Sequence, residues 1–575
     1  MTRNLIRELS LAFILGVLLL GIEQRAAAEQ SPRSTTKLPV IRDIRVEIRD
    51  IFDGPDLGGF YRTVNALKIS TKETVVRQEL LLAPGDVYNE FLVSESERNL
   101  RALPFIRQAS IIPVQEGEWV DLIVSVQDTW TLIPELGLST GGGSDRTAIG
   151  LSESNFLGLG KRLELLYADD EGREKIEAVW DDKRLFGTRQ RLLIGHFERS
   201  DGYRSVLLYG EPFRSLTDPN AWTVNTDFSD TVGRLFEAGD ESFIFRQQHE
   251  QLAARYTFSR GEPDVLLNRH TFGYEYSNDE FREADEDDFD DVDVDPDSVS
   301  QDPALLADDR RFSGPYWGYD RIEPDFISIN YVDRFDRVED FNLGNVFSAR
   351  VGLAPKILDS RYDTLLLSLN DSEGTRLSPT SFLRGEIGAG TRVDNGGFDN
   401  TVSRVEVKYV NVLGAKYLSD IYLGKHTIAM GAMLEYADDF DRDRQFVLGA
   451  SSGLRGYENR TFTGNKRYVF NIEERFHIVE DVFRLVNLGG ALFFDGGGVS
   501  DEFYSDFGIG LRIGFPRSSG GSVARFDLAF PLRDGPDGSD KFEPRLLFTT
   551  GQFFNAGLRS ESQGPGANVT IGSER

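Results

Sequence analysis

Apolar and polar residues alternate with a period of two along most of the chain from Thr131 to Phe554. Between Phe507 and Phe515, Phe, Ile and Leu occupy every second position, and glycines and Arg512 fill the positions between them. A period of two puts the two sets of side chains on opposite faces of a β-strand. Such segments follow one another, separated by turn clusters, and they predict between sixteen and about twenty strands.

Residues 38–128 carry a mixed pattern instead. The elements predicted there are a strand (40–48), two helices (71–81 and 89–103) and two further strands (106–114 and 119–126). Thr71 is expected to cap the first helix, and Asn89 stands at the start of the second. The order β-α-α-β-β is typical of a small α/β domain.

The first 28 residues have the pattern of a secretory signal peptide. Arg3 and Arg7 precede an apolar run over residues 11–22, and three alanines at 26–28 form a small-residue cleavage site. The run is too short to cross a bilayer as a helix, which needs about 20 apolar residues. An uncleaved anchor is the alternative. The signal predicts that the mature chain leaves the cytoplasm, and because no cysteine follows it, the chain is not expected to be a lipoprotein.

Two architectures satisfy the alternating segments. A soluble sandwich buries the apolar face against a second sheet, whereas a membrane barrel turns that face to lipid and keeps polar side chains inside. The signal peptide, the absence of cysteine and the arginines on glycine-lined faces favour the barrel. The 57 glycines and 41 phenylalanines of the 575 residues also suit tight turns and aromatic girdles. The sequence therefore predicts a transmembrane barrel over residues 130–554.

The chain is acidic, with a formal net charge of −30. This charge argues against a nucleic acid partner, because a phosphate backbone would be repelled. Twelve acidic residues lie between Asp279 and Asp297, in a loop between alternating segments. Calcium binds several carboxylates, but the spacing here lacks the glycine turn and terminal glutamate of an EF-hand. A solvated, disordered loop is the simpler expectation, and the sequence predicts neither a metal site nor a cofactor.

The stretch Gly449–Phe476 opens as a glycine-rich loop and then becomes an alternating strand. The loop carries Arg455, followed by Gly456 and Tyr457. Further on, Asp495 is the only charge in an apolar, glycine-rich strand. Because an unpaired buried carboxylate is strongly destabilising, a guanidinium partner is expected for it. The alternative is that Arg455 belongs to an ordinary exposed turn.

Three motifs in this order resemble the barrel of the bacterial surface antigen superfamily: Leu454-Arg455-Gly456-Tyr457, Asn471-Ile472-Glu473 and Phe493-x-Asp495-x-Gly497. That superfamily includes outer-membrane protein assembly factors and two-partner secretion transporters. The resemblance implies a barrel of sixteen strands, five of them after the Arg455 loop. It also implies that Arg455 reaches back into the lumen and pairs with Glu473 and Asp495.

The resemblance extends to both ends of the barrel. Residues 38–128 resemble a POTRA domain, with a generic small α/β domain as the alternative. The segment Arg545–Phe554, which includes Phe548 and ends in the aromatic Phe554, resembles the terminal strand signal of outer-membrane barrels. The chain departs from that pattern by continuing to Arg575, and residues 555–575 are expected to be disordered because they are polar and rich in Gly and Ser.

By resemblance, the function is insertion or translocation of client polypeptides at the outer membrane, without an enzymatic step. The POTRA domain, in the periplasm, would receive an extended client at its sheet edge. The barrel would supply a pore or a lateral gate. The implied partners are the client, outer-membrane lipid and subunits of an assembly machinery. A single POTRA domain is a departure, because assembly factors carry several and two-partner transporters carry two with a plugging helix.

Two other functions compete with this hypothesis. A passive channel or structural surface protein could use the same barrel. Residues 449–453 fit the G-x-S-x-G pattern of hydrolases, but that motif requires a strand-to-helix turn supported by an acid and a histidine. No helix is predicted after it, so a barrel lipase is disfavoured.

Overall fold

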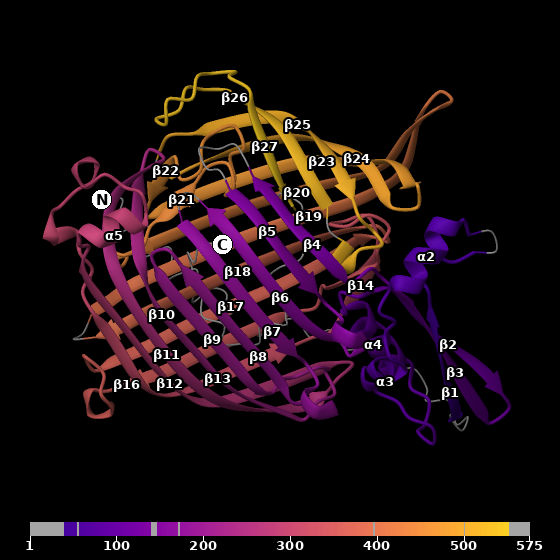
Figure 1. The fold of residues 1–575 in the computed structure, drawn as a ribbon. Coiled ribbons are helices and arrows are strands. Elements are labelled where there is room, and N and C mark those ends of the chain that lie inside the picture. Colours follow the sequence, from indigo (N-terminus) through magenta and orange to yellow (C-terminus); the bar gives the residue numbers. More distant parts are fainter. Residues whose placement is uncertain are drawn as a thin grey trace.

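The computed structural model describes residues 39–550, except 55–56, 140–145, 171–172, 395–396, 500 and 522. The predicted signal peptide, the predicted tail and Phe554 lie outside the described residues. The described chain forms a small α/β domain followed by a large closed barrel (Figure 1). No helix among the described residues is long and apolar enough to cross a membrane.

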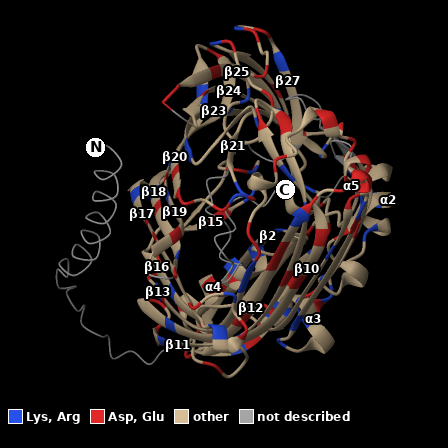
Figure 2. Ribbon diagram, turned by 90° about the vertical axis from the view of Figure 1, so that its left-hand side faces the viewer, with Lys and Arg blue, Asp and Glu red and all other residues tan. Residues whose placement is uncertain are grey.

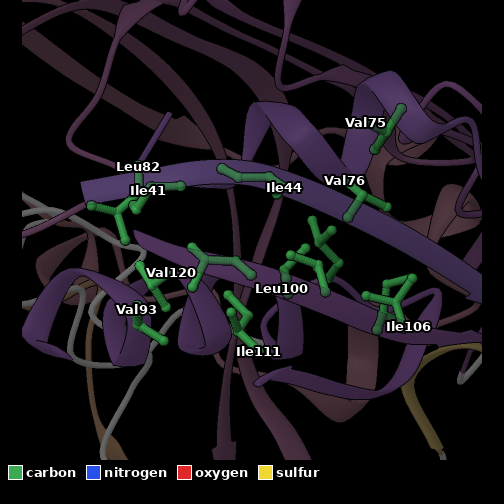
Figure 3. Close-up of a cluster of buried hydrophobic side chains, with 14 of the residues drawn as sticks. Ile41, Ile44, Val75, Val76, Leu82, Val93, Leu100, Ile106, Ile111 and Val120 are labelled. Carbon is green, nitrogen blue, oxygen red and sulfur yellow. The ribbon is translucent and has the colours of Figure 1, made fainter. Parts of the chain in front are cut away.

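The small domain is a three-stranded sheet in the order β1-β3-β2, with β1 parallel and β2 antiparallel to β3. Its elements are β1 (Val40–Arg49), α2 (Gly59–Leu67), α3 (Glu73–Gln78), α4 (Glu90–Arg101), β2 (Ile106–Glu116) and β3 (Trp119–Asp128). Apolar side chains from the sheet and from α3 and α4 form one core, which includes Ile44, Val76 and Leu100 (Figure 3). Burial of this core stabilises the domain, because each large aliphatic side chain contributes about 1.5–3 kcal/mol.

The predicted order of elements holds except in one place. Helix α2 was missed, and it lies between β1 and the first predicted helix. Asn89 caps α4 as expected, since its side chain accepts from the backbone N–H groups of Phe91 and Leu92. The prediction for Thr71 was wrong: Lys72 is the N-cap residue of α3, and the Thr71 hydroxyl accepts from Asn155 instead.

Within the part of the chain that the structure describes, the barrel is closed and has twenty strands. Sixteen strands, the number implied by resemblance, is therefore wrong, and the upper end of the range from the alternating pattern is right. Neighbours in sequence pair antiparallel, and β27 meets β4 where the barrel closes. The strands are β4 (Leu132–Ser139), β5 (Arg146–Glu153), β6 (Lys161–Asp170), β7 (Arg173–Asp182), β8 (Arg191–Arg199), β9 (Gly202–Glu211), β10 (Asn220–Glu237), β11 (Asp240–Glu262), β12 (Leu266–Glu283), β13 (Arg310–Ile322), β16 (Val346–Ala354), β17 (Thr364–Ser378), β18 (Ser381–Asp394), β19 (Gly397–Leu418), β20 (Ile421–Asp438), β23 (Lys466–Val482), β24 (Val486–Gly498), β25 (Tyr504–Gly514), β26 (Val523–Pro531) and β27 (Arg545–Thr550).

Two short hairpins and several turns are not strands of the barrel wall. The hairpins are β14 (Phe326–Ile329) with β15 (Glu339–Asn342), and β21 (Phe446–Leu448) with β22 (Phe462–Gly464). The loops also carry α5 (Glu286–Asp291) and 3-10 turns at Phe156–Gly158, Leu185–Gly187, Pro296–Ser298, Pro303–Leu305, Lys356–Leu358 and Ser519–Gly521. The acidic loop is therefore structured: Phe289 of α5 is buried against β10 and β11, and Asp288 pairs with Arg246.

The barrel wall is apolar outside and charged inside, as expected for a transmembrane barrel. On β25, Phe507, Ile509 and Leu511 are exposed on the outer face, whereas Asp506 and Arg512 are buried on the inner one. A soluble sandwich would show the reverse. The alternation of the sequence therefore has its origin in lipid on one side and a polar lumen on the other.

The small domain is attached to one end of the barrel, called the proximal rim below (Figure 1). The turns after β5, β7 and β9 all contact it. Lys72 N–H donates to the Gly158 carbonyl at 3.0 Å, and Arg184 pairs with Glu79 at 2.7 Å. The opposite end, where α5 lies, is the distal rim.

Candidate functional site

The connection between β20 and β23, residues 439–465, enters the barrel from the distal rim, and we call it the lock loop. Figure 2 views the barrel from the distal end, and β21 of this loop lies inside the outline of the wall. Leu454 and Tyr457 are fully buried in an apolar cluster with Phe462 and Val469. The loop is therefore packed against the inner wall, and it is not the exposed turn considered as an alternative.

Arg455 lies at the centre of this packing, with no exposed surface. Its Nε and Nη2 donate to the two oxygens of Asp495 at 2.7 and 2.9 Å, a bidentate pair. Its Nη1 donates to Asp527 Oδ2 at 3.3 Å. The guanidinium also stacks on the Phe493 ring, 3.4 Å from the centroid.

Glu473 lies beside Arg455 but is held mainly by another arginine. The distance from Arg455 Nη1 to Glu473 Oε2 is 3.9 Å, whereas Arg512 Nη2 donates to Glu473 Oε1 at 2.7 Å. Asp495 is thus the primary partner of Arg455, and Glu473 is a more distant one.

The site contains residues that the sequence analysis did not assign. Asp527 accepts from Arg455 and also from Arg512, at 2.5 Å, and Arg525 lies 3.2 Å from it. Arg475 lies 3.8 Å from Glu473. The charge cluster comprises four arginines and three carboxylates, all buried: Arg455, Arg475, Arg512, Arg525, Glu473, Asp495 and Asp527. Alternation places each of the strand residues in this cluster on the inner face of the barrel. The period of two that predicted the barrel could therefore also have identified them as lumenal residues.

Glycines on the inner face make room for this cluster. A Cβ at Gly510 would lie 2.1 Å from Asp527 Oδ1 and 2.3 Å from Arg512 Nη1. A Cβ at Gly456 would lie 2.6 Å from the Asp506 Cβ and 3.0 Å from the Pro531 nitrogen. The glycine after Arg455 is therefore needed for a close approach of the loop to the wall. Tyr457 completes the attachment, because its hydroxyl donates to the carbonyls of Ser505 and Arg533 at 3.3 and 3.0 Å.

A second segment enters the barrel from the proximal rim. It is the connection between β13 and β16, residues 323–345, which we call the inner hairpin; its β15 also lies inside the wall in Figure 2. Its apolar side chains Ile327, Val332 and Phe341 are buried against Phe382 of β18 and Val410 of β19. Phe335 packs on His477 of β23, with ring centroids 4.4 Å apart.

Three arginines join the inner hairpin to the small domain through ion pairs and hydrogen bonds. Arg101 of α4 forms a bidentate pair with Asp340, with both distances 2.8 Å. Arg107 of β2 pairs with Asp336. Arg337, buried on the hairpin, donates to the carbonyls that follow the end of α4: Leu103 at 3.1 Å, Pro104 and Ile106.

Arg475 connects the inner hairpin to the charge cluster. Its Nη1 donates to the Val332 carbonyl at 2.7 Å and to Asp333 at 3.1 Å, and its Nη2 lies 3.8 Å from Glu473. Within the hairpin, Glu339 accepts from the backbone N–H groups of Asp333 and Arg334. Burial and the neighbouring Asp333 charge raise the pKa of Glu339 to about 8. Charged residues thus join the small domain to the inner hairpin, and Arg475 joins the hairpin to the charge cluster.

Two other predicted features are placed as follows. Phe548 lies in β27, where its ring stacks on Phe526 with centroids 4.4 Å apart, and Phe554 is outside the described residues. Residues 449–453 form turns at the tip of the lock loop, with no helix directly after them. No group of three His, Asp or Glu side chains in the described part of the chain could hold a metal ion.

Comparisons with known proteins bear on these features. No family model matches the chain. Over 102 residues the chain is 31% identical to a protein of Treponema pallidum (strain Nichols) described as an outer membrane protein assembly factor. The chain resembles an outer membrane protein assembly factor. This agrees with the superfamily indicated by the motifs of the lock loop, β23 and β24. The match covers 16% of the chain and 12% of that protein.

Two solved structures are similar to this chain at low sequence identity. BamA from Haemophilus ducreyi, lacking POTRA domains 1–3, is 14% identical with a TM-score of 0.37, over 89% of this chain and 84% of that chain. CdiB from Acinetobacter baumannii is 11% identical with a TM-score of 0.44, over 90% of this chain and 74% of that chain.

Proposed function

We propose that this protein inserts or translocates client polypeptides at the outer membrane. The mature chain begins after a signal peptide at 1–28, the small domain at 38–128 is a POTRA domain in the periplasm, and residues 130–554 form the barrel. Chemistry on a substrate is not part of the proposal, because every residue of the charge cluster has an ion-pair contact and the cluster faces a packed loop.

One observation carries this proposal: a sheet with a free edge is held at the proximal mouth of a barrel. Among the described strands, β2 pairs with β3 alone. The start of its other edge contacts the inner hairpin through Arg107, and the Ile111 N–H donates to Glu97 of α4 at 2.5 Å. Ile112 and Val114 of β2 are exposed, and Pro113, which lacks an N–H, is of the kind confined to edge strands. A free edge with apolar side chains suits the addition of an extended client strand.

The contacts of the lumen argue against a passive channel. The lock loop packs into the barrel from the distal rim, and the inner hairpin packs into it from the proximal rim. Both are held by buried ion pairs and apolar side chains, as described above. A pore that conducts small solutes without a client would need neither the lock loop nor the inner hairpin in its lumen. In the proposed cycle, a client strand adds to β2, the inner hairpin is displaced, and the client leaves through the lumen or through the seam between β27 and β4.

Depletion of the protein in its native host tests this function. We expect the amounts of other barrel proteins, or of one secreted client, to fall in the outer membrane, with unfolded client accumulating in the periplasm. A steady loss of small-solute permeability with every barrel and secreted protein unchanged would contradict the proposal and favour the passive channel.

A further inference from the structure

Strands β19 and β20 continue past their neighbours at the proximal rim. Pairing of β18 with β19 ends at Asn411, and pairing of β20 with β23 starts at Lys425. Residues 412–424 therefore project as a two-stranded ribbon, in which residues 416–424 pair, among the described strands, only with one another. At its base, residues 412–415 pair with residues 425–427, and Val412 N–H donates to the Thr380 carbonyl at 2.9 Å. Figure 1 shows it as the orange hairpin that projects at the upper right, beyond the ends of the neighbouring strands.

The side chains of this ribbon are apolar and exposed on both faces. Tyr417, Leu418 and Ile421 are 63–65% exposed, and Tyr422 and Leu423 are also exposed. The Tyr417 and Tyr422 rings pack on each other, with centroids 5.3 Å apart. Lys416 and Asp420 are the only charged residues in 412–424.

A ribbon of this kind is unfavourable in free energy when water alone surrounds its apolar side chains and its unpaired backbone groups. A two-stranded hairpin is at best marginally stable by itself, and an unpaired edge with apolar side chains invites another strand. Contiguous exposed apolar surface of this kind marks an interaction site. The ribbon offers the same two features as β2, at another point of the proximal rim.

We propose that the ribbon is a second binding surface for the client polypeptide, and that it takes an extended segment with alternating apolar residues as an added strand. This inference rests on the proposed function and identifies what the site recognises. The base of the ribbon is held next to the lumen, because Lys425 pairs with Glu480 and contacts Tyr331 of the inner hairpin. A client bound there would lie at the mouth that the inner hairpin occupies.

Two other occupants fit the ribbon less well. Lipid would cover the apolar faces, but it would leave the backbone groups of both edges without hydrogen-bond partners, which is costly in hydrocarbon. A second copy of the chain would need a larger surface, because a stable interface takes about 20 to 30 residues from each partner, more than the ribbon holds. A short, transiently bound strand would cover the apolar side chains and would also form hydrogen bonds with the backbone groups of an edge.

Photo-cross-linking on the full-length protein in phospholipid vesicles tests the inference. Because the chain has no cysteine, Leu418→Cys accepts a single benzophenone label. The probe is a fluorescent peptide with the sequence of residues 545–554, which begins with strand β27. Its control has the same residues in an order that breaks the alternation. The matched position is Ile357→Cys, which is also highly exposed but lies at the distal rim.

We expect cross-linking of the ordered peptide at position 418, little at 357, and little for the scrambled peptide. The triple variant Tyr417→Ser, Ile421→Ser, Tyr422→Ser should bind the peptide about tenfold more weakly, as loss of the anchors of a small interface does. Its heat-modifiable gel migration should be unchanged.

Cross-links to lipid or to a second copy, or equal yields at both positions, would overturn the inference. If depletion impairs other barrels but position 418 captures no peptide, the proposed function stands without the ribbon. Capture at 418 with no effect of depletion would leave a peptide-binding ribbon and contradict the function.

Discussion

At the scale of single residues, Arg455 carries the strongest prediction because its buried charge is shared between two carboxylates. Arg455→Ala leaves Asp495 and Asp527 with less compensation, which costs about 3–5 kcal/mol for a buried pair. We expect the lock loop to loosen and protease to cleave residues 449–461 in intact cells, where the parent resists. Arg455→Lys should rescue poorly, because an ammonium cannot form the bidentate contact.

Arg442 provides the matched control for this experiment. It lies in the same loop but is exposed and donates only to backbone carbonyls, at 3.2 and 3.5 Å, so Arg442→Ala should change the unfolding free energy by less than about 0.5 kcal/mol. The exchange Arg455→Asp with Asp495→Arg should recover part of the loss. Equal cleavage of the parent and Arg455→Ala would show that no such lock exists.

Gly456 tests the fit of the loop without changing a charge. Gly456→Ala places a methyl group 2.6 Å from the Asp506 side chain, so the loop must shift, at a cost of about 1–3 kcal/mol. In thermal unfolding in detergent, Gly456→Ala should have a lower midpoint temperature than the control Gly385→Ala. The Cβ added in the control has its nearest neighbour at 3.9 Å. Identical midpoints would mean that the loop is not seated as closely as described.

Glu339 makes the docking of the inner hairpin depend on pH. Its pKa is raised from 4.5 to about 8, so between these values the docked hairpin holds a proton that the released one has lost. Docking is therefore most stable below pH 4.5 and weakens as pH rises towards 8, by at most about tenfold per pH unit. Hydrogen exchange of residues 326–342, corrected for intrinsic rates, should show this loss in the parent. Glu339→Gln, which can still accept both backbone hydrogen bonds, should not show it; the same pH dependence in both would contradict the assignment.

Part of the charge cluster could be predicted from sequence, and the rest depended on strand register. Asp495 was found because it is the lone charge in an apolar strand, and Arg455 because it is a cation followed by glycine and an aromatic in a glycine-rich loop. The resemblance to the superfamily then paired the two. Arg512 and Asp527 had the right parity, but parity does not say which residues of different strands meet. Their contact depends on the register that places Gly510 opposite Asp527.

At the scale of elements, the inner hairpin is the feature that the sequence did not reveal. Its strands are four residues each, too short for an alternating pattern to stand out. Its burial results from Phe382, Val410 and the small domain, which are distant in sequence. Helix α2 was missed for a related reason, since Phe52 and Tyr61 pack together across a turn and no periodic stripe over a long segment marks the helix.

Movement of this hairpin can be tested with a reversible cross-link. A short bis-methanethiosulfonate linker between Arg107→Cys and Asp336→Cys should hold the hairpin to β2 and stop client insertion until thiol releases it. The comparison is made within one variant, linked and released, because both lack the original ion pair. The control is Arg42→Cys with Asp121→Cys, an exposed pair within the small sheet, whose linkage should have no effect. Full activity of the linked hairpin would show that it does not need to move.

At the scale of the whole molecule, the alternation predicted a membrane barrel but left its size open. The alternating segments are hard to separate in the sequence from Trp222 to Phe258, which belongs to two long strands, β10 and β11, joined by a tight turn at residues 238–239. The five strands predicted after the lock loop are β23 to β27. The strand number of the superfamily, sixteen, does not hold for this chain. The motifs that carry the resemblance lie on the lock loop, β23 and β24, and they do not determine how many strands complete the barrel.

The central claim is that the barrel acts on a polypeptide client. The most direct measurement is the folding of a urea-unfolded eight-stranded outer-membrane barrel into vesicles that contain the purified protein, followed by protease protection. We expect folding several-fold faster than into empty vesicles, with slowing by Arg455→Ala and by the linked hairpin. Folding at the rate of empty vesicles, together with a steady conductance that needs no client, would contradict the account.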